Sequence, residues 1–381
     1  MPADRTPTWA LIAGGGTAGH VIPGLSVAAE LVARGHPPES IHFLGSERGI
    51  EVEMVPEAGF TLSVLPGRGL NSRRLDLANL RAVIGLVRAA FRGIGLVRRH
   101  RPAVVLSLGG YAAVAGIIGA AIWRVPVVVT EQNARGSLAN RLAGRFAKAC
   151  AVPFEGTDLP RAVVTGNPVR PEIVEAAAAA ADPTSRAAIR RELGVPEGST
   201  LIAVMSGSLG SRSVNRAAIA MAERLAARDD LVVHHIVGRR DWQSEHAPAP
   251  VLGPEAGIDH RSFEYESRAD RLLAAADLFI GRAGGSTVAE LAVIGVPSIL
   301  VPLPIAPRDA QFHNAEALVQ AGAAVRITDT ECTGERLVAL VEELLDDPAT
   351  LPAMAASARQ VGHPDAAARV AALCEEHARG D

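Results

Sequence analysis

Residues 11–20, Leu-Ile-Ala-Gly-Gly-Gly-Thr-Ala-Gly-His, place a glycine turn between an apolar strand and a helix, and the turn ends in a histidine. Glycines permit positive φ angles and a close approach of the backbone to a ligand. The backbone N–H groups at the following helix start would face a bound anion. The imidazole of His20 titrates near neutral pH and can accept a proton. The segment therefore predicts a site that holds phosphate and moves a proton, although His20 could instead only satisfy polar groups of the loop.

A dinucleotide site is a second interpretation of the same turn. Gly14, Gly16 and Gly19 satisfy the pattern G-x-G-x-x-G. A nicotinamide enzyme would also place Asp or Glu at the end of its second strand, where the carboxylate holds the ribose. Here the second expected strand, residues 41–44, runs into a Gly-Ser pair, and the first acidic residue is Glu47. The dinucleotide interpretation is weakened but stays open.

Two α/β domains are expected to position such turns. Short β-branched runs alternate with helical stretches in both halves of the chain, which is typical of parallel sheets covered by helices on both faces. A second glycine turn, residues 206–210, follows the first strand of the second half. We expect two Rossmann-like, doubly wound domains that face each other across a cleft, because ligands of such sheets gather at the carboxyl ends of the strands. The expected strands are residues 8–13, 41–44, 104–108, 125–130, 163–165, 201–205, 231–237, 277–280 and 298–302.

The domain boundary is expected at the Gly-Asn-Pro sequence that begins at Gly166. The first domain would comprise residues 1–166 and the second residues 167–381, with the last helix able to pack back on the first domain. The alanine-rich residues 175–181 could form a helix or a flexible join.

Composition excludes several classes of protein. The 381 residues are 48% hydrophobic, enough for buried cores, and the net charge of −3 argues against a nucleic-acid partner. The three cysteines are far apart, so neither a metal site nor a disulfide framework is expected, and a reducing cytoplasm is the natural compartment. The first residues do not have the pattern of a signal peptide, and no apolar run is long enough to span a membrane. We expect a protein that is soluble or attached to a membrane only at its surface.

An ordered series of motifs resembles the MurG family of bacterial glycosyltransferases. Together the motifs run through both halves of the chain, which makes them far more specific than one glycine turn. They are Gly15 to His20 with Pro23-Gly24, Leu108-Gly109-Gly110-Tyr111, Glu131-Gln132-Asn133, Leu138-Ala139-Asn140-Arg141, Gly166-Asn167-Pro168-Val169-Arg170, Gly207-Ser208 with Gly210, Arg282 to Glu290, and Gln311 with Asn314-Ala315.

The resemblance implies a GT-B glycosyltransferase with an acceptor- and membrane-facing first domain and a UDP-sugar-binding second domain. The reaction would be an inverting, metal-independent transfer of N-acetylglucosamine from UDP-GlcNAc to the undecaprenyl-linked muramyl-pentapeptide, which converts lipid I to lipid II in peptidoglycan synthesis. The donor would be a substrate, and no cofactor is implied. The protein would then lie at the cytoplasmic face of the cell membrane as a peripheral protein, with no nucleic-acid partner.

Site residues follow from the same resemblance, position by position. It makes His20 the catalytic base and Glu131 a second catalytic position. Arg170 would contact the diphosphate, unless it only pairs with a neighbouring glutamate on the surface. Glu290 would hold the ribose hydroxyls, although a helix N-terminus also favours an acid for electrostatic reasons alone. The further implied contacts are the cleft-lining Thr17, Ala18, Gly19 and Asn133, the phosphate contact Ser208, the uracil contact through backbone near Glu266, the nucleotide contact Thr287, and the sugar contacts Gln311 and Asn314.

Three positions depart from the family pattern. Thr130 stands where the family usually has histidine, and Leu209 and Ala310 stand where it usually has glutamine. A buried sugar hydroxyl without its partner costs about 1–3 kcal/mol, so such changes can alter the preferred substrate. The alternatives are therefore a related UDP-sugar transferase with another acceptor or sugar, or a noncatalytic paralogue that binds nucleotide-sugar or lipid as a scaffold.

An arginine-rich segment, residues 68–101, predicts contact with an anionic membrane surface. If residues 75–99 are helical, five arginines form one stripe, and the opposite face carries Leu80, Ile84, Val87, Phe91 and Ile94. This basic amphipathic pattern suits anionic lipid headgroups, although the same pattern also describes a helix that packs on a sheet with its arginines in water. We expect a combination, in which the apolar face serves the fold and the arginines attract the membrane. The five are Arg74, Arg81, Arg88, Arg92 and Arg99.

Overall fold

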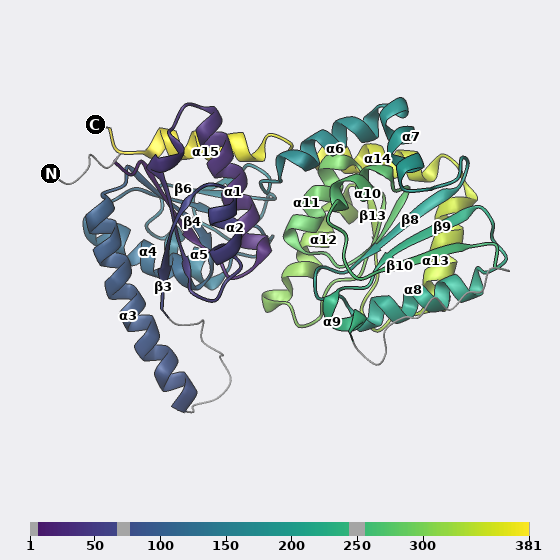
Figure 1. Ribbon diagram of the computed structural model, residues 1–381, viewed down its shortest axis with the longest axis horizontal. Helices are drawn as coiled ribbons and strands as arrows, with labels where there is room; N and C mark the ends of the chain where they lie inside the picture. Colours follow the sequence, from purple (N-terminus) through teal and green to yellow (C-terminus); the bar gives the residue numbers. More distant parts are fainter. Residues whose placement is uncertain (1–6, 67–76, 244–255, 381) are drawn as a thin grey trace. The chain divides into compact units, whose positions relative to one another are not determined.

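The computed structural model describes residues 7–66, 77–243 and 256–380. The chain divides into two compact units, the first formed by Met1–Arg170 with His363–Asp381 and the second by Pro171–Gly362. In each unit, helices lie on both faces of a parallel sheet (Figure 1). No helix of the described residues is long and apolar enough to cross a membrane.

The first unit is built on a seven-stranded parallel sheet in the order β3-β2-β1-β4-β5-β6-β7. Its strands are β1 (Ala10–Gly14), β2 (Ile41–Ser46), β3 (Thr61–Leu65), β4 (Val104–Gly109), β5 (Val127–Thr130), β6 (Ala149–Val152) and β7 (Ala162–Val164). Its helices are α1 (Ala18–Ala33), the 3₁₀ turn η1 (Pro38–Ser40), α2 (Glu51–Glu57), α3 (Leu77–His100), α4 (Gly110–Trp123), α5 (Leu138–Gly144) and α15 (Ala366–His377).

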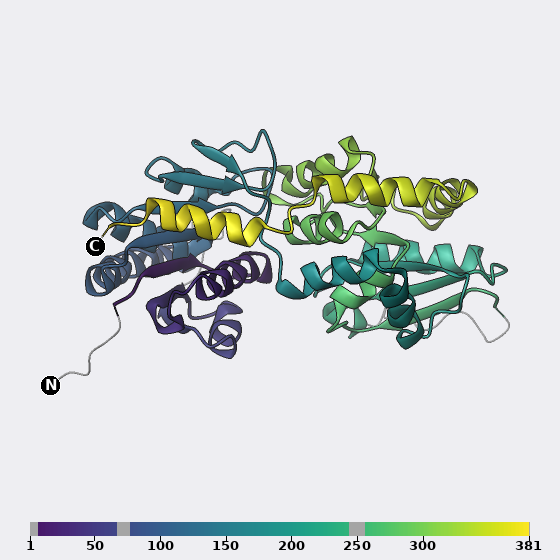
Figure 2. The same cartoon turned by 90° about the horizontal axis from the view of Figure 1, so that it is seen from above.

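Helix α15 belongs to the first unit although it comes from the end of the chain. In Figure 2 it lies in yellow beside the purple helix α1. Val370, Ala371 and Cys374 are buried in the same core as β1 and α1. Glu375 forms ion pairs with Arg34 at 2.9 Å and with His36 at 3.1 Å.

The second unit is built on a six-stranded parallel sheet in the order β10-β9-β8-β11-β12-β13. Its strands are β8 (Thr200–Met205), β9 (Leu231–Ile236), β10 (Asp259–Phe263), β11 (Leu278–Gly281), β12 (Ser298–Leu300) and β13 (Ala324–Arg326). Its helices are α6 (Pro171–Ala181), α7 (Pro183–Glu192), α8 (Arg212–Arg224), α9 (Arg239–Trp242), α10 (Ala269–Ala275), α11 (Gly285–Ile294), the 3₁₀ turn η2 (Pro307–Asp309), α12 (Ala310–Gln320), α13 (Gly334–Asp346) and α14 (Thr350–Val361). The alanine-rich residues 175–181, left open between a helix and a join, lie in α6.

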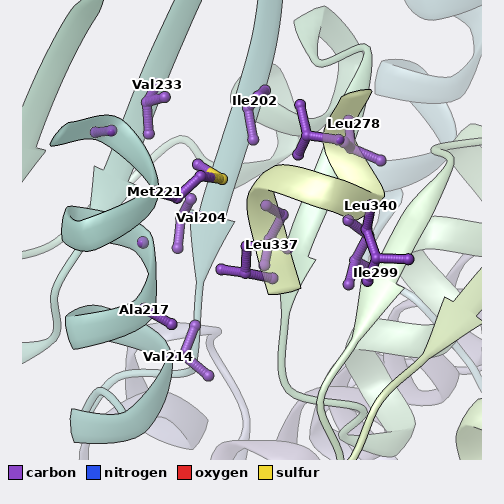
Figure 3. Close-up of a cluster of buried hydrophobic side chains, with 14 of the residues drawn as sticks. Ile202, Val204, Val214, Ala217, Met221, Val233, Leu278, Ile299, Leu337 and Leu340 are labelled. Carbon is purple, nitrogen blue, oxygen red and sulfur yellow. The ribbon is translucent and has the colours of Figure 1, made fainter. Parts of the chain in front are cut away.

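One hydrophobic core of the second unit fills the space between its sheet and the helices α8 and α13 (Figure 3). Val214, Ala217 and Met221 recur along one face of α8 and are at most 3% exposed. They pack toward Ile202 and Val204 of β8. Burial of apolar side chains on both faces of the sheet holds the strands in place. The positions of the strand ends then determine where the loops described below begin.

Candidate functional site

The six strands of the second sheet follow the same order as the first six strands of the first sheet, and each sheet reverses its winding beside its first strand. The reversal lies between β1 and β4 in the first unit and between β8 and β11 in the second. The carboxyl ends of strands at such a switch point leave a crevice in which α/β proteins bind ligands. Glycine-containing turns follow β1, β4, β8 and β11, so each unit brings two of them to its switch point. The turns after β1 and β8 are those expected from the sequence.

The turn after β1 leads directly into α1. Gly15 and Gly110 are in close approach, since a Cβ on Gly110 would lie 2.9 Å from the Gly15 carbonyl oxygen. Gly16 has a φ of 96° with open space around it, so its backbone conformation alone favours glycine there. Thr17 is the N-cap of α1, and Ala18 and Gly19 are its first residues.

Thr17 orients the histidine that ends the turn. Its Oγ1 lies 3.0 Å from His20 Nδ1. Burial lowers the pKa of His20 below 6.5, although the negative charges of Glu131 and Glu51 act in the opposite direction. The imidazole is therefore neutral at neutral pH, which is the protonation state that a general base requires.

Glu131 is fully buried and organises its own loop. Its Oε1 accepts hydrogen bonds from the backbone N–H groups of Gln132 and Asn133, both at 3.1 Å. Its Oε2 accepts from Ser137 N at 2.8 Å and from Asn140 Nδ2 at 2.9 Å. These contacts hold the loop between β5 and α5, and the carboxylate charge acts on His20. A catalytic role for Glu131 and a ligand contact for Asn133 stay predictions.

In the second unit, the turn after β8 carries Ser208 on the surface. The Ser208 carbonyl oxygen accepts a hydrogen bond from Arg239 N at 3.0 Å, which joins this turn to the start of α9. Gly210 permits a tight contact, because a Cβ there would lie 2.0 Å from the Val237 carbonyl oxygen. Leu209, one of the departures from the family pattern, is 61% exposed.

Glu266 follows strand β10, whose carboxyl end lies at the same edge of the parallel sheet as the carboxyl end of β8. Its Oε1 accepts from Arg268 N at 2.8 Å, and its Oε2 lies 3.6 Å from His234 Nε2. Burial lowers the pKa of His234, with Glu266 acting in the opposite direction. The neighbouring Tyr265 is 53% exposed and lies under the guanidinium of Arg239.

The turn after β11 places Thr287 and Glu290 in the first two turns of α11, and both side chains are half-buried. Arg282 anchors this turn, because its guanidinium donates to the carbonyl oxygens of Val301 and Pro302 and to Ser211 Oγ. Arg282 also pairs with Asp329 at 2.7 Å. The network connects the turn after β11 with the start of α8 and with the loop after β13.

Loss of the Asp329 charge is expected to weaken this network. Asp329 also accepts from Ser213 Oγ at 2.6 Å. Asp329→Asn should lower the free energy of unfolding by about 1–3 kcal/mol, because Arg282 loses its charged partner inside the unit. Urea denaturation of the variant measures this, with the exposed Asp346→Asn as the matched control. An unchanged midpoint would show that the ion pair does not stabilise the turn.

Gln311 and Asn314 lie on α12. The chain enters this helix through two consecutive left-handed residues, Arg308 with φ 57° and Asp309 with φ 52°. Gln311 Oε1 accepts from Leu303 N at 3.0 Å. Asn314 is fully buried and donates to the Ala283 carbonyl oxygen at 3.2 Å. Asn314 thus supports the glycine turn after β11, and its contact with a sugar stays a prediction.

Arg170 and Thr130, two further positions considered in the sequence analysis, both lie in the first unit. Arg170, expected at the diphosphate, is half-buried at the end of the stretch Gly166–Arg170. Thr130 is fully buried, and its Oγ1 has no hydrogen-bond partner among the described residues.

Sequence reasoning missed three carboxylates that hold these turns. Glu51 contacts the turn after β1, Asp241 of α9 contacts Asn215 of α8, and Asp329 contacts Arg282. Asp241 is only 3% exposed and accepts from Asn215 Nδ2 at 3.1 Å. None of the three belongs to a glycine motif, so only the spacing from the end of the preceding strand could have indicated them.

Known proteins match the chain in both units. The glycosyltransferase family 28 N-terminal domain matches residues 10–152, and the C-terminal domain of the same family matches residues 201–370. A relative from Alkalilimnicola ehrlichii is 41% identical over 97% of this chain and 99% of its own length. Another from Desulforudis audaxviator is 38% identical over 93% of this chain and 95% of its own length. Both are named UDP-N-acetylglucosamine–N-acetylmuramyl-(pentapeptide) pyrophosphoryl-undecaprenol N-acetylglucosamine transferase.

Solved structures give the same result. The crystal structure of Acinetobacter baumannii MurG has a TM-score of 0.72 and 27% identity, and covers 97% of this chain and 99% of its own. The chain belongs to the MurG family of glycosyltransferases. The glycosyltransferase of kitacinnamycin has a TM-score of 0.71 at 19% identity, which shows only the shared fold. The expected membership of the MurG family and the two Rossmann-like, doubly wound units of the GT-B class are thereby confirmed.

Proposed function

We propose that the chain transfers N-acetylglucosamine from UDP-GlcNAc to the undecaprenyl-linked muramyl-pentapeptide, the step from lipid I to lipid II in peptidoglycan synthesis. The observation that carries the proposal is the identity of 41% and 38% to transferases named for this reaction, over nearly the whole chain. The donor is a substrate, and the chain uses no further cofactor.

His20 acts as the general base in the proposed reaction. When Nδ1–H donates to Thr17 Oγ1, the lone pair of the neutral ring lies on Nε2. Nε2 takes the proton of the acceptor hydroxyl while the hydroxyl oxygen attacks C1 of the donor sugar. The bond from C1 to the UDP oxygen breaks on the opposite face, so the α-linked donor gives a β-linked product.

The leaving UDP needs stabilisation of its negative charge. Ser208 and Thr287 lie at the glycine turns that begin α8 and α11, where backbone N–H groups favour an anion. Arg170 supplies the cation, so no metal is required. The carboxylate of Glu290 holds the ribose hydroxyls, backbone near Glu266 contacts the uracil, and the amides of Gln311 and Asn314 read the sugar hydroxyls. Thr17, Ala18, Gly19 and Asn133 line the acceptor side with His20 and Glu131.

A donor screen tests the sugar preference. The chain is incubated with a lipid-linked muramyl-pentapeptide analogue and each of several UDP-sugars, and the product is identified by mass. We expect transfer from UDP-GlcNAc to exceed transfer from every other donor. Preference for another sugar would instead favour a related transferase. This alternative is a specific one, because Ala310 and Leu209 stand where the family usually has glutamine. Inertness toward every UDP-sugar would favour a noncatalytic scaffold.

The first unit is proposed to contact the cytoplasmic face of the membrane through α3. Ala89, Gly93 and Val97 recur along its buried face. A Cβ on Gly93 would lie 2.7 Å from the Ala115 carbonyl oxygen, so this face packs tightly on α4. Phe91, expected on the apolar face that serves the fold, is instead 72% exposed because it points away from α4.

Exposed basic and apolar side chains occur both on α3 and at the end of α4, where Trp123 donates a hydrogen bond to the Ile94 carbonyl oxygen of α3. Arg88 and Arg92 flank Phe91 and are exposed, and Ile122 and Trp123 at the end of α4 are 53% and 40% exposed. Apolar side chains among arginines match an anionic lipid surface. Arg68, Arg73, Arg74 and the side chain of Arg81 lie outside the described residues.

Charge removal on α3 should weaken membrane binding. The double variant Arg88→Gln and Arg92→Gln is expected to bind vesicles of phosphatidylcholine and phosphatidylglycerol about 30-fold more weakly, because each arginine near the surface contributes about 1 kcal/mol. Vesicle sedimentation measures the affinity. The matched control is Arg216→Gln with Arg224→Gln, two exposed arginines of α8. Equal affinities of the two double variants would contradict a membrane role for α3.

A further inference from the structure

The carboxylate of Glu51 is buried beneath the glycine turn that carries His20. Glu51 is the first residue of α2 and is only 1% exposed. Its Oε2 accepts a hydrogen bond from Gly16 N at 2.8 Å. Its Oε1 accepts from Ser46 N at 2.7 Å and from Ser46 Oγ at 2.8 Å. One side chain therefore links the turn after β1 to the end of β2.

Three glycines make room for this carboxylate. A Cβ on Gly15 would lie 2.3 Å from Glu51 Oε1, and a Cβ on Gly49 would lie 2.0 Å from Oε2. A Cβ on Gly45 would lie 2.5 Å from Glu51 Cγ. Real Cβ atoms do not approach so closely, so these positions exclude other residues while Glu51 is in place. Burying a carboxylate is costly unless its oxygens are hydrogen-bonded, so the fitted space and the three hydrogen bonds indicate that the fold holds Glu51 in one place.

Glu51 accepts its hydrogen bond from Gly16, the residue directly before Thr17, and Thr17 orients the ring of His20. Thr17 follows Gly16 directly, caps α1 and contacts His20 Nδ1 through its Oγ1. A shift of the Gly16 backbone would move Thr17 and with it the ring of His20. Misplacement by about 1 Å can cost about 100-fold in rate. The negative charge of Glu51 also raises the pKa of His20 against the effect of burial.

We propose that Glu51 is a positioning residue for the transfer reaction, which fixes the backbone of Gly15 to Thr17 so that Thr17 holds the His20 ring in its reactive orientation. The inference rests on the proposed function of His20 as the base. Glu51 itself does not touch a substrate, since its two oxygens are directed to Gly16 and Ser46.

Glu51→Gln tests the proposal at nearly constant shape. The amide replaces one acceptor oxygen with a donor, so one backbone N–H loses its partner. We expect kcat to fall about 10–100-fold, with little change in KM for UDP-GlcNAc. We also expect the acid limb of the kcat profile to move to lower pH, because a carboxylate that stabilises the protonated ring has lost its charge. The matched control is Glu53→Gln, an exposed glutamate of the same helix.

A second readout does not depend on activity. In protein labelled with ¹⁵N-histidine, the signal of His20 is assigned by its loss in His20→Asn, and its titration and tautomer are followed without substrate. Glu51→Gln should lower the pKa of His20 and change the tautomer that Thr17 selects. If no transferase activity is found in the parent chain, the proposed function fails, and the NMR result still decides whether Glu51 positions His20.

A variant that fails to fold would not end the test. Ser46→Ala removes only one of the three hydrogen bonds to Glu51, and we expect a smaller loss of kcat and the same direction of tautomer change. Thermal melting establishes that the compared variants are folded. The proposal would be overturned if Glu51→Gln had the same kcat and the same His20 signals as Glu53→Gln. If Glu51→Gln does not fold, the same comparison is made with Ser46→Ala.

Discussion

Replacing His20 with asparagine is expected to lower kcat by about 10²–10⁴-fold, the usual contribution of a positioned general base. Asparagine can still place a polar group near Thr17 Oγ1, so the turn keeps much of its local hydrogen bonding. The loss should therefore appear in kcat, with the melting temperature close to that of the parent chain. Steady-state kinetics at saturating UDP-GlcNAc measure it.

The pH profile separates proton transfer from packing. Burial lowers the pKa of His20, so the base form persists below pH 6.5, and kcat of the parent chain should fall only as the pH drops through this lowered pKa. The acid limb should disappear in His20→Asn. The control is His377→Asn on α15, outside the glycine turns. A full rate in His20→Asn, or an unchanged acid limb, would show that another group takes the proton.

Glu290→Ala is expected to weaken binding of UDP about 100-fold. A carboxylate that accepts from two ribose hydroxyls contributes about 1.5 kcal/mol or more for each bond, which together is about 3 kcal/mol. The variant should lose most of its preference for UDP over 2′-deoxy-UDP, because the group that reads the 2′-hydroxyl is gone. Calorimetric titration with both nucleotides measures the two affinities.

The alternative role of Glu290 predicts a different pattern. If Glu290 only provides a favourable charge near the start of α11, its removal should lower stability slightly and leave nucleotide affinity unchanged. Glu335, exposed in the first turn of α13, is the matched control for that role. Equal effects of Glu290→Ala and Glu335→Ala on UDP binding would contradict the ribose contact.

Much of the fold could be predicted from the sequence because buried parallel strands leave continuous apolar runs. Residues 41–44 and 201–205 were recognised in this way, and both lie in strands. Four strands were missed, and one of them is the three-residue edge strand Ala324–Arg326. Thr61–Leu65 and Asp259–Phe263 lie at the edges of their sheets, where half-exposed positions accept polar side chains, and Ala149–Val152 is short and built of small residues.

The site was predictable where glycine and histidine mark the chain, and less so where side chains meet from distant segments. Gly14 to His20 is a local signal. Glu51 lies 35 residues beyond Gly16, and Asp329 lies 47 residues beyond Arg282, so neither contact leaves a pattern in one segment. Phe91 shows the same limit, because its helix has apolar residues on more than one side and only the packing of Gly93 on α4 decides which face is buried.

Inverting transfer of N-acetylglucosamine to a lipid-linked muramyl-pentapeptide is the reaction on which the proposed residue roles depend. Its most direct test is the anomeric configuration of the product, read from the proton coupling at C1 after incubation of the chain with UDP-GlcNAc and the acceptor analogue. We expect one added N-acetylglucosamine in β linkage. An α-linked product, or no transfer by a folded chain that binds UDP, would contradict it.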